Sequence, residues 1–99
     1  AALEALSIHG MVPEEAYREV QARAHVDLGR VQILEESLRH DVIAFLTSIS
    51  EQVGPMSRYL HRGMTSSDCI DTALALQLGD AGVVLLDGID DCAKALLPR

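Results

Sequence analysis

The most chemically distinctive segment of the chain is His-Arg-Gly-Met-Thr-Ser-Ser-Asp, residues 61–68. Thr65 and Asp68 have the spacing of a helix capping box, and an apolar periodic stretch follows them. A helix start presents unpaired backbone N–H groups and the positive end of the helix dipole, which attract carboxylates. Ser66 and Ser67 add two hydroxyl donors to this helix start. The segment is therefore typical of an anion-binding site, although spacing alone favours an ordinary helix cap.

A second polar segment, Arg39-His40-Asp41, also precedes an apolar periodic stretch. In one interpretation His40 is a surface histidine beside a capping aspartate, which is its commoner role. In the other, Asp41 orients His40 or the helix start, so that His40 and Arg39 face a substrate. His61, which lies before a turn at Gly63, poses the same choice. Neither histidine indicates chemistry when it is considered alone.

The elements that position these residues are predicted from apolar spacings of three and four, which favour helices. Gly10 is typical of a helix end, and Pro13 suits the first turn of the next helix. Asp27 and Asp41 are predicted N-caps, and Gly54-Pro55 ends the fourth helix. The predicted helices are 1–9, 13–24, 27–38 and 41–53, with a helical turn within 57–61. The predicted buried stripe of the fourth helix is Val42, Phe45, Leu46, Ile49 and Val53.

The last segment predicts one long helix from Ser66 to Leu97, because apolar residues repeat there every eleven positions. Glycines at 79, 82 and 88 oppose this helix by roughly 1 kcal/mol each relative to alanine. It would be about 48 Å long, whereas a compact domain of this size is about 34 Å across. Its apolar face therefore needs partners, which indicates either a fragment or a subunit of a helical bundle.

The composition favours an all-α fold, because 48% of the residues are hydrophobic and only 3% are aromatic. The net charge of −7 argues against nucleic acid as a partner, since a phosphate backbone requires a clustered basic face. No export signal and no uninterrupted apolar run of membrane-spanning length is evident, so we expect a cytoplasmic protein without a membrane partner. Cys69 and Cys92 would lie about 34 Å apart on one helix, so both are predicted to be reduced. No ligand spacing indicates a metal.

Together the two polar segments are far more specific than either one. His61-x-Gly63-x-Thr65-Ser66-Ser67-Asp68, with Asp71-Thr72-Ala73 after it and Arg39-His40-Asp41-Val42-Ile43-Ala44-Phe45 before it, resembles the adenylosuccinate lyases of the fumarase/aspartase superfamily. Both motifs occur in the family's order and at about its spacing, and the similarity runs from roughly Pro13 to the end. Ser37-Leu38 departs from the family pattern, in which threonines are usual.

The resemblance implies an enzyme that releases fumarate by β-elimination from adenylosuccinate and from the succinylated aminoimidazole-carboxamide ribonucleotide of purine biosynthesis, without a cofactor. It implies that Thr65 and Ser66 hold a substrate carboxylate as negative charge builds on it. Arg39, His40 and Asp41 would bind the nucleotide substrate and position the group that protonates the leaving nitrogen. His61 and Ser67 are weaker candidates for the same pocket.

The resemblance also implies an organisation: an N-terminal helical domain over 1–64, then the first long helix of a central bundle over 65–99. In the intact enzyme that bundle forms a homotetramer. The segments expected to carry the family's histidine acid and serine base are not recognisable, so we expect a fragment without catalytic residues of its own and without activity when isolated. Two alternatives stay open, namely a carboxymuconate cycloisomerase-like member of the superfamily and a non-catalytic acidic helical interaction module.

Overall fold

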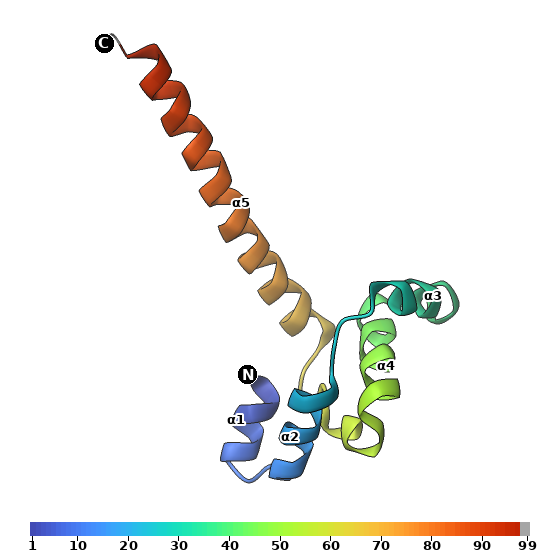
Figure 1. The fold of residues 1–99 in the computed structure, drawn as a ribbon. Coiled ribbons are helices and arrows are strands. Elements are labelled where there is room, and N and C mark those ends of the chain that lie inside the picture. The colour runs from blue at the N-terminus through green and yellow to red at the C-terminus, as the bar shows by residue number, and fades with distance from the viewer. Residues whose placement is uncertain (98–99) are drawn as a thin grey trace. The chain divides into compact units, whose positions relative to one another are not determined.

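A computed structural model describes residues 1–97. Over that range the chain is helical and contains no strand (Figure 1), which confirms the all-α prediction. The chain divides into two units, residues 1–65 and residues 66–99, which are described separately below. The elements are α1 (Ala2–Ile8), α2 (Glu14–Arg23), α3 (Leu28–Leu38), α4 (Asp41–Val53), the 3-10 helix η1 (Gly54–Tyr59) and α5 (Ser66–Leu96).

Helices α1 and α2 form a hairpin in the first unit. Gly10 has a φ of +67°, a left-handed conformation that glycine adopts without strain, and it reverses the chain after α1 as predicted. Pro13 lies one position earlier than predicted, at the N-cap, and α2 begins after it. The Tyr17 hydroxyl donates to Glu4 Oε1 at 3.1 Å and so ties the two helices together. That hydrogen bond raises the pKa of Tyr17, because it favours the protonated phenol.

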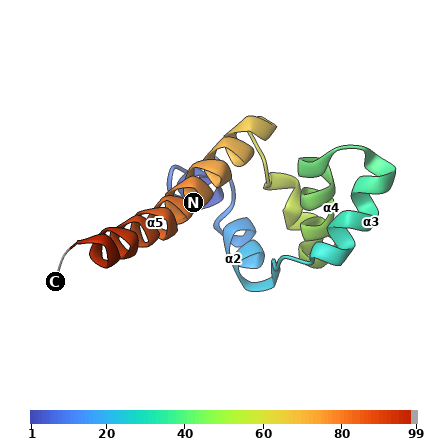
Figure 2. The same ribbon diagram turned by 90° about the horizontal axis from the view of Figure 1, so that it is seen from above.

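Helices α3 and α4 pack against each other and lie next to one another in Figure 2. Asp27 caps α3 as predicted, since its Oδ1 accepts from the backbone N–H of Arg30 at 2.9 Å. The Arg30 guanidinium donates to both carboxylate oxygens of Glu51 at 2.8 and 2.7 Å, which joins the two helices. The Gln52 amide accepts from the His25 N–H at 2.8 Å and donates to the His25 carbonyl at 3.0 Å. Two side chains of α4 thus hold both α3 and the segment before it.

The hydrophobic core lies in the first unit and is built largely on α4. α4 contacts α3 as well as α2 and η1, so two of its faces are covered. The predicted stripe is partly wrong: Phe45, which it includes, is 40% exposed, while Ala44, which it omits, is 0% exposed. Ser48 is also buried, and its Oγ makes no hydrogen bond. The buried apolar residues are Val12, Ala16, Val42, Ala44, Ile49 and Val53.

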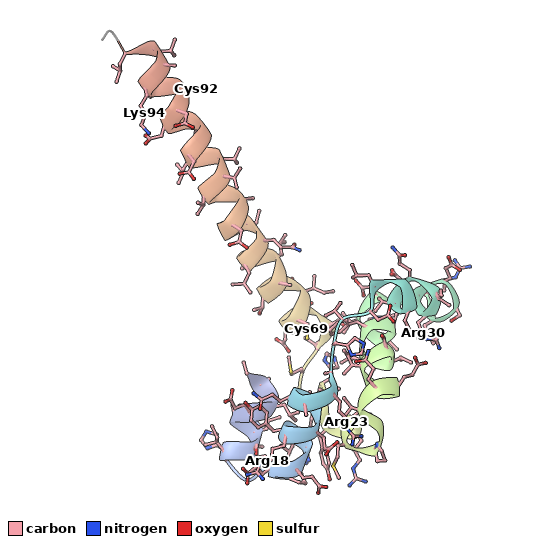
Figure 3. All side chains as sticks on the ribbon, in the orientation of Figure 1. Arg18, Arg23, Arg30, Cys69, Cys92 and Lys94 are labelled. Carbon is pink, nitrogen blue, oxygen red and sulfur yellow. The ribbon has the colours of Figure 1, made fainter. Side chains whose placement is uncertain are left out.

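Helix α5 is uninterrupted from Ser66 to Leu96, so the predicted long helix is present and its glycines do not break it. None of its described residues is buried. By length and composition alone α5 is also able to cross a membrane, but core helices of soluble proteins pass the same test, so this finding is weak evidence. Cys69 and Cys92 lie near opposite ends of this helix and are not joined by a disulfide bond (Figure 3).

Candidate functional site

The first motif forms the tight junction between α3 and α4. Arg39 ends α3 in a left-handed conformation with a φ of +54°, and its backbone N–H donates to the Glu35 carbonyl at 2.8 Å. His40 then adopts an extended backbone and becomes the N-cap of α4. The prediction that Asp41 caps this helix is therefore wrong, because Asp41 is its first helical residue. Arg39, His40 and Asp41 all lie at the positive end of the α4 dipole.

The geometry of His40 assigns different roles to its two ring nitrogens. Nδ1 accepts from the backbone N–H of Ile43 at 3.2 Å, which requires a lone pair on Nδ1. The same Nδ1 lies 3.5 Å from Asp41 Oδ1, a distance at which only a protonated Nδ1 would attract the carboxylate. The shorter contact is the cap, and Asp41 Oδ1 already accepts from the Val42 N–H at 2.7 Å. In the capping state His40 is neutral and Nε2 carries the proton, so Nε2–H is the donor that remains for a ligand.

The second motif forms a compact turn before α5. His61 has a φ of +62° and Gly63 a φ of +72°, so two left-handed residues lie two positions apart. The Met64 N–H donates to the His61 carbonyl at 3.2 Å and closes the turn. The predicted turn at Gly63 is therefore present. His61 is half-buried, whereas Thr65 at the end of the turn is exposed.

The hydroxyl residues of the second motif lie at the start of α5. Thr65 occupies the position directly before the first helical residue, Ser66, which is where an N-cap lies. Ser66 is half-buried and Ser67 is exposed. Asp68 lies in the first turn, where an acidic group suits the helix dipole. The start of α5 thus presents hydroxyls and backbone N–H groups together, as the sequence predicted.

The structure places most of the predicted residues in the first unit. Arg39, His40, Asp41, His61 and Thr65 belong to residues 1–65, whereas Ser66 and Ser67 belong to the second unit. That both motifs converge on one substrate stays a prediction.

The two motifs share an unusual backbone conformation. Among the described residues, the non-glycine residues with a positive φ are Arg39 and His61, one in each motif. Such conformations cost roughly 1–2 kcal/mol per residue and are concentrated at functional sites. Neither this strain nor the hydrogen bond from the Arg62 side chain to the Met11 carbonyl was predicted from the sequence. The visible signal was that both residues lie at helix ends beside a turn.

Comparison with known proteins supports the resemblance that the motifs indicated. No protein-family model matches the chain. The adenylosuccinate lyase of Synechocystis is 45% identical over 96 residues, which is 97% of this chain and 22% of that lyase. The adenylosuccinate lyase of Aquifex aeolicus is 42% identical over 82% of the chain and 19% of that lyase. The enzyme of the same name from Bacillus subtilis is 36% identical over 90% of the chain and 21% of its own length.

These alignments also correct one detail, because the similarity to the Synechocystis protein covers all but three residues and therefore begins well before Pro13. Both motifs lie inside the matched stretch. The chain spans about a fifth of the length of the curated relatives it matches. The resemblance indicated by the motifs is thus confirmed: across nearly its whole length this chain is similar to part of the adenylosuccinate lyases.

Proposed function

We propose that residues 1–99 supply substrate-binding residues to an adenylosuccinate lyase, which releases fumarate from adenylosuccinate and from the succinylated aminoimidazole-carboxamide ribonucleotide. The observation that carries this proposal is the 45% identity to the Synechocystis lyase, because it spans 97% of the chain and so includes both motifs. The relatives reported above share that name, which favours the lyase over a cycloisomerase.

The β-elimination removes a proton from the carbon next to a carboxylate, and negative charge builds on that carboxylate. Thr65 and Ser66 donate to this carboxylate at the start of α5, where the helix dipole also favours an anion. Loss of one preorganised donor to such a charge costs about 3–4 kcal/mol of barrier. Thr65 and Ser66 therefore act by stabilising charge, and Ser67 is a further candidate donor beside them.

Arg39, His40 and Asp41 bind the nucleotide substrate at the start of α4. The cap engages Nδ1 of His40, so Nε2–H is the group that donates to the substrate and positions it for protonation of its leaving nitrogen. Asp41 holds the helix start, because its Oδ1 accepts from the Val42 N–H, and the exposed Arg39 supplies a positive charge for an anionic group. His61 contributes to the same wall of the pocket. The catalytic acid and base come from other parts of the complete lyase.

The proposal extends to the assembly. The apolar surface of α5 is covered in a central helical bundle of a homotetramer, and the enzyme works in the cytoplasm in purine biosynthesis. Its support is the exposure of large apolar residues along α5, which an isolated helix leaves in water. These residues include Leu74, Leu78, Leu85 and Ile89, which are 50%, 62%, 67% and 64% exposed.

The test is a chimera in which residues 1–99 replace the matching stretch of the Synechocystis lyase. We expect the chimera to release fumarate from both succinylated substrates, as followed by absorbance, and the isolated 99-residue chain to show no turnover, because it lacks the acid and base. A control chimera with His40→Ala and Ser66→Ala should fold into the same oligomer yet lose activity. A folded unmodified chimera without activity would contradict the proposal.

A further inference from the structure

The side chain of Arg62, a residue of the second motif, forms a hydrogen bond with a residue far away in the sequence. Its Nη1 donates to the backbone carbonyl of Met11 at 3.1 Å, across 51 positions of sequence. Met11 is itself held, because its N–H donates to the Leu6 carbonyl at 2.8 Å. Val12, the next residue, is 5% exposed and belongs to the core. The acceptor of the Arg62 hydrogen bond is therefore a fixed point on the α1–α2 hairpin.

The turn that carries Arg62 requires such a support. It contains a left-handed histidine, His61, and a left-handed glycine, Gly63, with Arg62 between them. Within the turn the Met64 N–H donates to the His61 carbonyl at 3.2 Å, near the long end of the usual range. A non-glycine residue stays in this conformation only when its surroundings hold it there. The Arg62 side chain is a link from this turn to the α1–α2 hairpin.

Arg58, on the preceding 3-10 helix, makes no comparable link among residues 1–97. Arg58 donates to the hydroxyl of the adjacent Tyr59 at 2.8 Å and stacks over its ring at 4.8 Å. These contacts connect Arg58 only with the next residue. Both arginines are exposed and carry the same charge, so Arg58 is a matched control for Arg62.

We propose that Arg62 is a positioning residue that holds His61 in its left-handed, half-buried position through the hydrogen bond to the Met11 carbonyl. The part of this proposal that concerns catalysis rests on the proposed lyase function, in which His61 faces the substrate. The part that concerns the turn does not rest on it. Arg62 itself contacts no substrate and acts only through His61.

The turn is tested in the 99-residue chain by amide hydrogen exchange. Arg62→Ala should speed exchange of the Met64 N–H by about tenfold, because local opening of the turn becomes easier. Arg62→Lys retains a charged donor and should recover part of this protection. Arg58→Ala should leave the rate within about twofold. Equal protection in Arg62→Ala and in the unmodified chain would overturn the proposal.

The route through His61 is tested in the Synechocystis chimera by a double-mutant cycle. Arg62→Ala should lower kcat/KM by about tenfold, Arg58→Ala should not lower it, and Arg62→Lys should restore part of the loss. The double variant His61→Ala/Arg62→Ala should be no less active than His61→Ala, because the two residues act as one unit. Additive losses would overturn the proposed route. If the unmodified chimera is inactive, the lyase function fails, and the exchange measurement still decides whether Arg62 holds the turn.

Discussion

The two units of the chain bury their hydrophobic residues to different extents. Residues 1–65 fold their helices against one another and bury a core that includes Ala16, Ala44 and Val53. Helix α5 buries none of its described residues, although many of them are leucine, isoleucine and valine. A helix that is apolar around much of its circumference is typical of a protein interior. The first unit thus supplies its own packing, whereas α5 depends on packing from outside its own sequence.

This contrast concerns the two motifs directly. The first motif joins two packed helices, α3 and α4, whose other ends are tied together by the contact between Arg30 and Glu51. The second motif, residues 61–68, is divided where the packed unit ends, between Thr65 and Ser66. Preorganised donors require a rigid support. We therefore expect the Arg39–Asp41 segment to be ordered in the isolated chain, and the hydroxyls of α5 to become functional only within a larger assembly.

The largest expected effect separates the two units by their packing. Ile49→Ala in the core should lower the free energy of unfolding of the 99-residue chain by about 2–5 kcal/mol, because it leaves a cavity beside α4. Ile49 is 6% exposed, whereas Ile89 on α5 is 64% exposed. Ile89→Ala should change the same quantity by less than about 0.5 kcal/mol. Urea titration followed by circular dichroism measures both, and equal effects would show that α5 is packed in the isolated chain.

The fold was largely predictable because its local signals are strong. Asp27 caps α3, Gly10 ends the turn after α1, and α4 ends at Val53 before Gly54-Pro55, all as the sequence indicated. Ala44 was omitted because periodicity describes one buried face, whereas α4 packs against α3 as well as α2 and η1; the exposure of Phe45 depends on tertiary packing that apolar spacing does not encode.

The site was predictable in its residues and less so in its geometry. Its two motifs were identified by residue type and order. The sequence analysis placed the N-cap of α4 at Asp41, whereas the structure places it at His40. Both side chains are able to cap a helix, and the left-handed Arg39 that precedes them was not predicted. Convergence of the motifs depends on how the units assemble, which local spacing does not encode.

The next largest effect concerns the start of α5. Ser66→Ala in the Synechocystis chimera should lower kcat/KM by roughly ten- to a hundredfold, because it removes a hydroxyl donor to a charged group worth about 1.5–3 kcal/mol. The melting temperature should hardly change, since Ser66 is half-buried and outside the core. The control is Ser37→Ala, whose hydroxyl donates only to the Leu34 carbonyl of its own helix. Full activity of Ser66→Ala with both substrates would contradict the carboxylate-binding role and leave the second motif with the role of a helix cap alone.

A smaller effect separates strain from function at the first motif. Arg39→Gly should raise the free energy of unfolding by about 0.5–1 kcal/mol, because glycine adopts the left-handed conformation without the cost that arginine bears. Arg39→Ala removes the same guanidinium but keeps the strain, so it should not be stabilised. Both variants should lower the activity of the chimera, since both lack the charge. Thermal melts of the two 99-residue variants give the comparison, and equal stability would mean that the backbone at this position is unstrained.

The smallest effect concerns the pH dependence of the packed unit. The Arg30 guanidinium beside Glu51 holds the pKa of that carboxyl below its usual value of 4.5. A carboxyl whose pKa is lowered on folding stabilises the folded state above its unfolded pKa and loses this contribution as the pH falls through the folded value. Glu51→Gln should therefore lower the melting temperature of the 99-residue chain slightly at pH 7 and not at all at strongly acidic pH. Both side chains are more than two-fifths exposed, so solvent and salt keep the effect small.

The control for Glu51 is Glu36→Gln on α3, which removes the same charge from a chain of net charge −7, and within the described part of the chain Glu36 forms no ion pair. Relief of overall repulsion acts in both variants, so their difference isolates the contact between Arg30 and Glu51. This difference should be present at pH 7, shrink as the pH falls through the carboxylate range, and diminish in high salt. A difference that persists at strongly acidic pH would mean that the contribution of Glu51 does not depend on its charge, because glutamine has nearly the same size and shape as glutamate.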